Sequence, residues 1–158
     1  MQDHERGALL RKARIIADYQ FGRGAGGALF PATVEFLLSR SRRIAQITEG
    51  GSRIATLRSL DGLFTLSIEG ARRLHQVLPF PRLRVVMNAE SRDFVRKGET
   101  AFCKHVLDAD PEIRAYDEVL VVDEQDHLLA TGRVMLASGE LRNFQHGVAV
   151  KVRQGVEE

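Results

Sequence analysis

The sequence contains only one cysteine and no tryptophan among its 158 residues. The lone cysteine, Cys103, excludes an intramolecular disulfide and cannot by itself form a thiolate zinc site. No apolar run approaches the roughly 20 residues that a helix needs to cross a bilayer. The first residues also lack the apolar segment of a secretory signal. These absences predict a cytoplasmic protein that makes no use of a membrane.

Enzyme and cofactor motifs are also scarce. Gly22, Gly24 and Gly27 have the spacing of a dinucleotide-binding loop, but an amphipathic helix rather than a buried strand is expected before them. We interpret these glycines as a tightly packed loop, because glycine allows turns and close approaches that a Cβ forbids. We therefore expect no cofactor. The five histidines show no metal-ligand spacing, so no metal site is expected either.

Candidates for catalysis are correspondingly weak, and no catalytic residue is assigned. Strand alternation would place Cys103 and His105 on one face, which leaves a Cys–His nucleophilic pair open beside the alternative of a buried cysteine. The acidic clusters at 108–112 and 123–126 fall where turns are expected, and we interpret them as turn residues. The sequence therefore gives no positive case for an enzyme.

Positive charge is concentrated in the first half of the chain. Residues 1–78 hold 12 Lys and Arg against 7 Asp and Glu, whereas residues 79–158 hold 11 against 14. Most of these cations are arginines, whose planar side chain suits phosphate. A basic half is the expected footprint of a nucleic-acid partner, although a solvated surface gives the same composition. Arg42 and Arg43, in a dense basic run, are the candidates for RNA contact in this half.

The pattern of residues 1–78 predicts a small α+β domain. Apolar positions predict a helix over 8–17, and the short apolar stretch 34–38 is expected to be helical. Three short strands, forming a three-stranded antiparallel sheet, are predicted between glycine-containing turns. A last helix is expected to end before Pro79. The strands are predicted over 42–48, 53–58 and 63–68, and the last helix over 70–78.

Residues 79–158 change in character after Pro79-Phe80-Pro81, which we take as the domain boundary. A helix over 90–97 is expected to be closed by Gly98. Strands dominate the rest and predict a small, partly open β-barrel. The strands are expected over 83–87, 101–107, 118–122, 127–136 and 148–152. Because three short strands bury little area alone, we also expect the two halves to pack together.

One surface of the second half has the residue types of a phosphate-binding edge. Lys97 and Gly98 end the predicted helix, and Thr100, Phe102 and Lys104 alternate onto one face of the predicted strand. A helix end, a glycine turn and a strand edge bearing lysine together suit a phosphate backbone. The alternative is that Phe102 belongs to the core and Lys104 is merely solvated.

From Arg82 onward the chain resembles a PUA domain, an RNA-binding module. The resemblance rests on an ordered set of segments, with one departure at Ala115-Tyr116, where the family usually has a glycine before the next strand. The segments are Arg96–Phe102 (RKGETAF), Val106–Arg114, Asp117–Asp123 (DEVLVVD), Leu129–Arg133 (LATGR) and His146–Arg153 (HGVAVKVR). This resemblance implies a PUA-type β pseudo-barrel.

The first half resembles the segment that precedes the PUA domain in archaeal archaeosine tRNA-guanine transglycosylase. The matching segments include Ile16–Gly26 (IADYQFGRGAG), Asp61–Leu66 (DGLFTL) and Gly70–His75 (GARRLH). The chain thus looks like the C-terminal RNA-binding portion of that enzyme, without room for its catalytic barrel. The resemblance implies a non-catalytic protein that binds tRNA or other structured RNA, as a separate subunit or partner of an RNA-modifying enzyme.

By the same analogy the RNA-binding groove of a PUA domain forms between its helix and the adjoining strands. The resemblance therefore implies RNA-binding roles for Lys97, Gly98, Thr100, Phe102 and Lys104. Two other classes remain open. The first is a protein-interaction or assembly adaptor without direct RNA recognition, and the second is a small hydrolase or transferase using Cys103 and His105.

Overall fold

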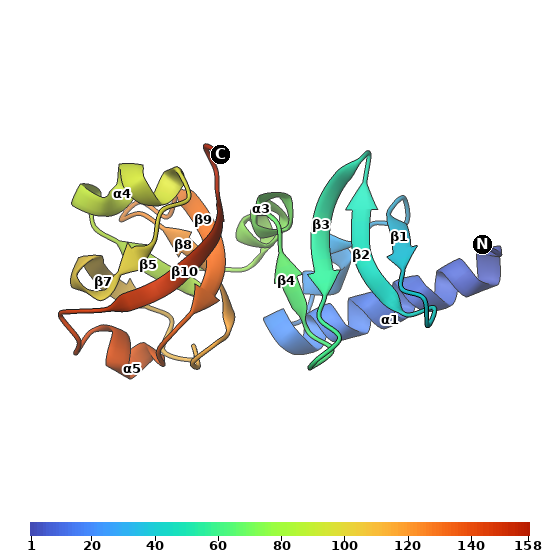
Figure 1. The fold of residues 1–158 in the computed structure, drawn as a ribbon, viewed down its shortest axis with the longest axis horizontal. Coiled ribbons are helices and arrows are strands. Elements are labelled where there is room, and N and C mark those ends of the chain that lie inside the picture. Colours follow the sequence, from blue (N-terminus) through green and yellow to red (C-terminus); the bar gives the residue numbers. More distant parts are fainter. The chain divides into compact units, whose positions relative to one another are not determined.

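The computed structural model describes residues 1–158 and divides into two compact units, Met1–Leu78 and Pro79–Glu158. Each unit has its own β-sheet (Figure 1). Each also has its own buried apolar residues. None of the helices combines the length and apolar character that a membrane span requires.

The first unit is an antiparallel four-stranded sheet with three helices. The sheet order is β1-β2-β3-β4, and helix α1 contacts both α2 and β4, while α3 packs on β3 and β4. In chain order the elements are α1 (Asp3–Phe21), α2 (Ala25–Leu29), β1 (Glu35–Leu38), β2 (Ile44–Glu49), β3 (Ser52–Leu57), β4 (Phe64–Leu66) and α3 (Ile68–Val77).

The core of this unit follows from strand register and helix spacing. Ile47, Ala55 and Leu66 are paired neighbours on β2, β3 and β4, and all three are buried. Ala13 and Ala17 lie four residues apart on the buried side of α1. Small residues at these helix positions allow the helix to approach its neighbours closely, so the apolar sheet face and the helices enclose one core.

The helix expected over 34–38 is wrong, because this segment forms strand β1. Phe36 pairs with Ile47 and Leu37 with Gln46, so the sheet has four strands rather than three. A five-residue stretch with four apolar residues is too short for its period to separate helix from strand. The turn that follows makes the segment a strand, because Ser39 N donates to the carbonyl oxygen of Arg43 at 2.8 Å and closes a hairpin between β1 and β2.

The glycine segment after α1 forms a turn and a close approach between two helices. Gly22 and Gly24 supply the turn with positive φ, whereas the close approach is at Gly26 and not at the predicted Gly24 or Gly27, where a Cβ would meet nothing within 4 Å. Gly26 N donates to Asp18 Oδ1 at 2.7 Å. A Cβ on Gly26 would lie 2.4 Å from the backbone oxygen of Arg14, so only glycine lets α2 approach α1 this closely. The segment therefore joins two helices and precedes an antiparallel hairpin, where a dinucleotide loop would need a parallel βαβ unit.

The second unit is a six-stranded, barrel-like sheet of order β6-β10-β9-β8-β5-β7. Strands β5 and β8 are parallel and the other pairs are antiparallel. Its elements are β5 (Arg84–Met87), α4 (Ala89–Arg96), β6 (Ala101–Phe102), a 3₁₀ helix (Cys103–His105), β7 (Val106–Ala109), β8 (Glu118–Val122), β9 (Leu128–Val134), α5 (Ser138–Leu141) and β10 (Val148–Gly155).

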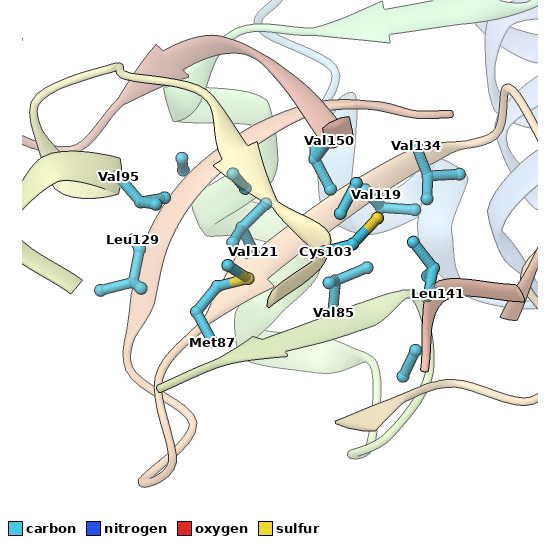
Figure 2. Packing of buried hydrophobic residues seen from close by; sticks show 14 of the residues in the cluster. Val85, Met87, Val95, Cys103, Val119, Val121, Leu129, Val134, Leu141 and Val150 are labelled. Atoms are coloured by element: carbon cyan, nitrogen blue, oxygen red, sulfur yellow. The ribbon is translucent and has the colours of Figure 1, made fainter. Parts of the chain in front are cut away.

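The core of the second unit fills the inside of this sheet. Figure 2 shows aliphatic side chains from several strands converging, with Val95 of α4 and Leu141 of α5 reaching the same cluster. Cys103 is only 3% exposed and its sulfur lies within this cluster. The alternative of a buried cysteine is therefore confirmed, and burial raises the pKa of its thiol.

The single strand expected over 101–107 is wrong. Strand β6 pairs with β10, whereas β7 pairs with β5, and β6 and β7 stand at the two ends of the sheet order. The chain must cross between them, and the 3₁₀ helix makes that crossing. Cys103 and His105 consequently share no strand face, and His105 Nδ1 lies 3.2 Å from Asn88 Nδ2 instead. The Cys–His nucleophilic pair is therefore wrong.

Candidate nucleic-acid interface

A groove in the second unit runs between the end of α4 and the β6 segment. We call it the aromatic groove; its volume is about 230 Å³. Residues from α4, the following turn, β6 and the 3₁₀ helix line it, and they are Ser91, Phe94, Glu99, Thr100, Phe102, Lys104 and His105. Three of the residues predicted for the site, Thr100, Phe102 and Lys104, are thus together, although a 3₁₀ helix rather than one strand face brings them there.

Two phenylalanines stand open in this groove. Phe94 is 59% exposed and Phe102 is 44% exposed, so the alternative that Phe102 belongs to the core is wrong. Phe102 also borders a second depression of about 200 Å³, lined with Lys104, Gln145, His146 and Gly147. Exposed aromatic faces beside a cation form a surface on which an unpaired base can stack.

The charges around the groove are few. Lys104 is exposed and makes no ion pair, while Glu99 contributes one carboxylate to the lining. His105 lies deeper, between Asn88 and the Glu90 carboxylate, whose Oε2 is 4.0 Å from His105 Nδ1. Lys104 is therefore the cation most available to a phosphate at this site.

Lys97 and Gly98 lie at the end of α4 and do not line the groove. Gly98 has φ +96° and its N–H donates to Val95 O at 3.0 Å, which is the helix-ending geometry predicted for this glycine. A Cβ on Gly98 would collide with the Glu158 side chain. Gly98 thus shapes the turn that leads into the groove, and the exposed Lys97 adds a cation beside it.

Arg42 and Arg43, adjacent in sequence, are separated in their surroundings. Arg42 adopts φ +62° and its guanidinium forms an ion pair with Glu5, with Nη2 and Oε1 2.7 Å apart. Arg43 lines a different depression of the first unit and has no acidic partner. Of the two arginines, only Arg43 therefore lines this depression.

The acidic clusters have the turn role predicted for them. Asp110 Oδ2 accepts a hydrogen bond from Leu83 N at 2.8 Å, and Asp110 Oδ1 accepts one from Glu112 N at 3.0 Å. Asp123 Oδ1 accepts from the backbone N–H groups of Gln125 and His127, each at 2.9 Å. These carboxylates hold loops, and no group of three or more potential ligands stands ready for a metal ion.

Sequence reasoning missed Phe94 as a site residue. It lies next to the charged Arg92 and Asp93 on α4, and an apolar residue within the exposed face of an amphipathic helix is a usable signal. Gln145 and His146 were also missed. They lie more than 40 residues beyond Phe102, and only the pairing of β10 with β6 brings them near it.

Comparison with known proteins agrees with both halves of the fold. Residues 83–156 match the model of the PUA domain, and residues 11–81 match that of the patch-forming domain C2 of tRNA-guanine transglycosylase. The chain is therefore a PUA-domain protein with a C2 domain before the PUA domain. More particularly, it resembles the archaeal tRNA-guanine(15) transglycosylases over these two domains.

The curated relatives are much longer than this chain. The tRNA-guanine(15) transglycosylase of Thermococcus kodakarensis is 53% identical over 154 residues, which cover 97% of this chain and 26% of that enzyme. The chain thus spans about a quarter of the length of the relatives that it matches.

Solved structures show the same fold at low identity. A hypothetical protein of Pyrococcus horikoshii matches with a TM-score of 0.72 and 18% identity, covering 96% of this chain and 92% of its own. A PUA-domain protein of Thermoplasma acidophilum matches with a TM-score of 0.63 and 17% identity, covering 94% and 91%. The prediction of an α+β domain followed by a PUA-type pseudo-barrel is confirmed.

Proposed function

We propose that this chain is a non-catalytic RNA-binding protein of the cytoplasm that binds tRNA through the aromatic groove of its PUA domain. The observation that carries the proposal is the open placement of Phe94 and Phe102 beside the unpaired Lys104. Rings left in solvent cost hydrophobic stabilisation, and a stacked base would cover them. The relatives' name, tRNA-guanine(15) transglycosylase, points to tRNA as the RNA.

Different residues of the site are proposed to contact different parts of the bound RNA. Duplex RNA hides its base edges in a deep, narrow groove, so unpaired nucleotides are what an aromatic surface can recognise. The 3′ end of tRNA supplies such nucleotides beside a duplex stem. We assign base stacking to Phe94 and Phe102, the nearest phosphate to Lys104, and flanking backbone contacts to Lys97 and the Gly98–Thr100 turn.

Base exchange is not assigned to these two domains. The chain matches a C2 domain and a PUA domain and spans about a quarter of the length of the transglycosylases that it resembles. We propose that it delivers RNA to a catalytic subunit of an RNA-modifying enzyme, as a partner or as part of one.

Fluorescence anisotropy with labelled tRNA, with the same tRNA lacking its unpaired 3′ nucleotides, and with an unrelated duplex tests this proposal. Intact tRNA is expected to bind most tightly, and binding should weaken as salt rises because lysines displace condensed counterions. Lys104→Ala should weaken binding and reduce the slope of log K against log salt by up to about one unit. Lys97→Ala should act in the same direction but less strongly.

Lys151→Ala supplies the control, because Lys151 is an exposed lysine of β10 that lines neither depression near Phe102. Equal binding of all three RNAs, together with Lys104→Ala and Lys151→Ala variants that match each other, would remove the aromatic groove as an RNA site. A salt-resistant protein complex in place of RNA binding would favour an assembly adaptor.

A further inference from the structure

The first unit has a depression of about 580 Å³ that the function proposed above does not use. We call it the α1 groove. Three segments distant in sequence meet around it: Lys12 comes from α1, Arg43 from the turn between β1 and β2, and Arg58 directly follows β3. Hydroxyl residues also line it, and they are Ser39, Ser41, Thr56 and Ser59. Its size is within the range of ligand-binding sites.

The lining of the α1 groove carries positive charge only. No aspartate or glutamate contributes to it. Arg58 is paired with Asp61, whose Oδ2 lies 2.7 Å from Arg58 Nη2, but Lys12 and Arg43 have no acidic partner. Two cations are thus left without a counter-charge in a concave surface, where low-dielectric walls strengthen the attraction for an anion.

The position of Arg43 is fixed by the fold. Ser39 N donates to Arg43 O at 2.8 Å, and Arg43 N donates to Ser39 Oγ at 3.2 Å. Arg42, at φ +62°, occupies the left-handed position of this turn and is held by Glu5 outside the groove lining. The turn therefore fixes the backbone of the arginine that lines the groove, while its neighbour lies outside the lining.

We propose that the α1 groove binds a phosphodiester of the RNA backbone, as a second contact of this chain with RNA. Arginine, lysine and serine hydroxyls are the side chains that contact phosphate oxygens in nucleic-acid complexes. No aromatic residue lines the groove, so it has no surface for stacking a base. Its contribution is to hold the backbone in place, independently of sequence.

The test measures the salt dependence of binding to tRNA and to an unrelated duplex. Arg43→Ala and Lys12→Ala are each expected to weaken binding to both RNAs equally. Each should also lower the slope of log K against log salt by about one unit. Arg42→Ala is the matched control, since it removes the same formal charge from the adjacent position and should leave the slope unchanged. Arg43→Lys should restore most of the slope, and melting temperatures verify that each variant is folded.

The inference rests on the proposed function. Measurements with the unrelated duplex distinguish a failure of the proposed tRNA recognition from a failure of the α1 groove contact. If tRNA binds no better than the duplex, the proposed tRNA recognition fails, but the slopes of the variants with the duplex still test the α1 groove. If Arg43→Ala and Arg42→Ala have equal slopes with both RNAs, the groove contact is wrong even when tRNA is recognised.

A titration with inorganic phosphate, followed by NMR of the backbone amides, distinguishes a free anion from RNA. Saturating shifts of the Ser41 and Arg43 amides at submillimolar phosphate, combined with unchanged RNA slopes in Arg43→Ala, would overturn the RNA assignment and leave a small-anion site. Small amide shifts on addition of phosphate, together with a reduced salt slope of RNA binding in Arg43→Ala, support the contact with the RNA backbone.

Discussion

Phe94 near the end of α4 and Phe102 on β6 line one groove, each with about half of its surface in solvent. Two different constraints place them there. Helix α4 buries Ser91 and Val95, which leaves Phe94 on the exposed side, while β6 buries Ala101 and Cys103 follows into the core, which turns Phe102 outward. The backbone that builds the core therefore also presents both rings.

Replacing Phe102 with alanine should weaken tRNA binding without unfolding the chain. Loss of one stacked base costs roughly 1–3 kcal/mol in binding free energy. Phe144→Ala is the control, because Phe144 is 48% exposed but lines neither depression next to Phe102. Anisotropy with intact tRNA measures both variants. A Phe102→Ala variant that binds like Phe144→Ala would exclude stacking on this ring.

Gly26→Ala should destabilise the first unit, because the added Cβ would lie 2.4 Å from Arg14 O. Overpacking of this kind costs about 1–3 kcal/mol in the free energy of unfolding. Gly27→Ala, in the same helix with nothing within 4 Å of its Cβ, should be neutral or stabilise by up to about 1 kcal/mol. Urea denaturation of both variants checks the contrast, and similar midpoints would contradict the packing argument.

The same segment should not bind nucleotide cofactors. NAD, FAD or ATP at millimolar concentration is expected to leave the melting temperature unchanged, since a bound ligand in excess raises stability by mass action. A dose-dependent increase with any of them would show that the glycines form a ligand site.

Asp123 should make part of the stability depend on pH. Burial of its carboxyl tends to raise the pKa, but hydrogen bonds from His127 and Gln125 outweigh this and hold the pKa below its ordinary value. A carboxyl with a depressed folded-state pKa stabilises the fold above its unfolded pKa of about 3.9, and that stabilisation is lost as pH falls through the folded pKa.

Asp123→Asn should therefore lower the free energy of unfolding at pH 7 by about 1–3 kcal/mol. In this variant the free energy of unfolding should also fall less steeply as the pH decreases below about 5. Glu124→Gln, at the exposed neighbouring carboxylate, provides the control. Urea denaturation across this pH range measures both. An Asp123→Asn curve parallel to that of the unmodified chain would contradict the assigned role of these hydrogen bonds.

Local sequence signals predicted most of the fold. The hairpin between β2 and β3 turns at Gly50-Gly51, both with positive φ, and α4 is closed by Gly98. Strand β1 and the break at Cys103–His105 were not predictable in this way. Each depends on which distant strand supplies the pairing partner, and the sequence of a short apolar segment does not show which strand that is.

Three of the residues predicted for the candidate site line one groove, whereas Phe94, Gln145 and His146 were not predicted for it. Thr100, Phe102 and Lys104 are close in sequence and remain close in space. In the α1 groove, Lys12, Arg43 and Arg58 come from three separate segments, and only the tertiary fold joins them. The different surroundings of Arg42 and Arg43 could not be predicted, because a left-handed φ at a non-glycine residue such as Arg42 gives no reliable sequence signal.

The most direct test of RNA binding at the aromatic groove is photocrosslinking of the intact chain to tRNA carrying 4-thiouridine at its unpaired 3′ end. Mass spectrometry of the digested complex locates the attachment. We expect crosslinked peptides that contain Phe94 or Phe102, and their loss when unlabelled tRNA competes. Crosslinks confined to other surfaces, or crosslinks equally abundant with thiouridine placed in a duplex stem, would contradict the proposed role of the groove.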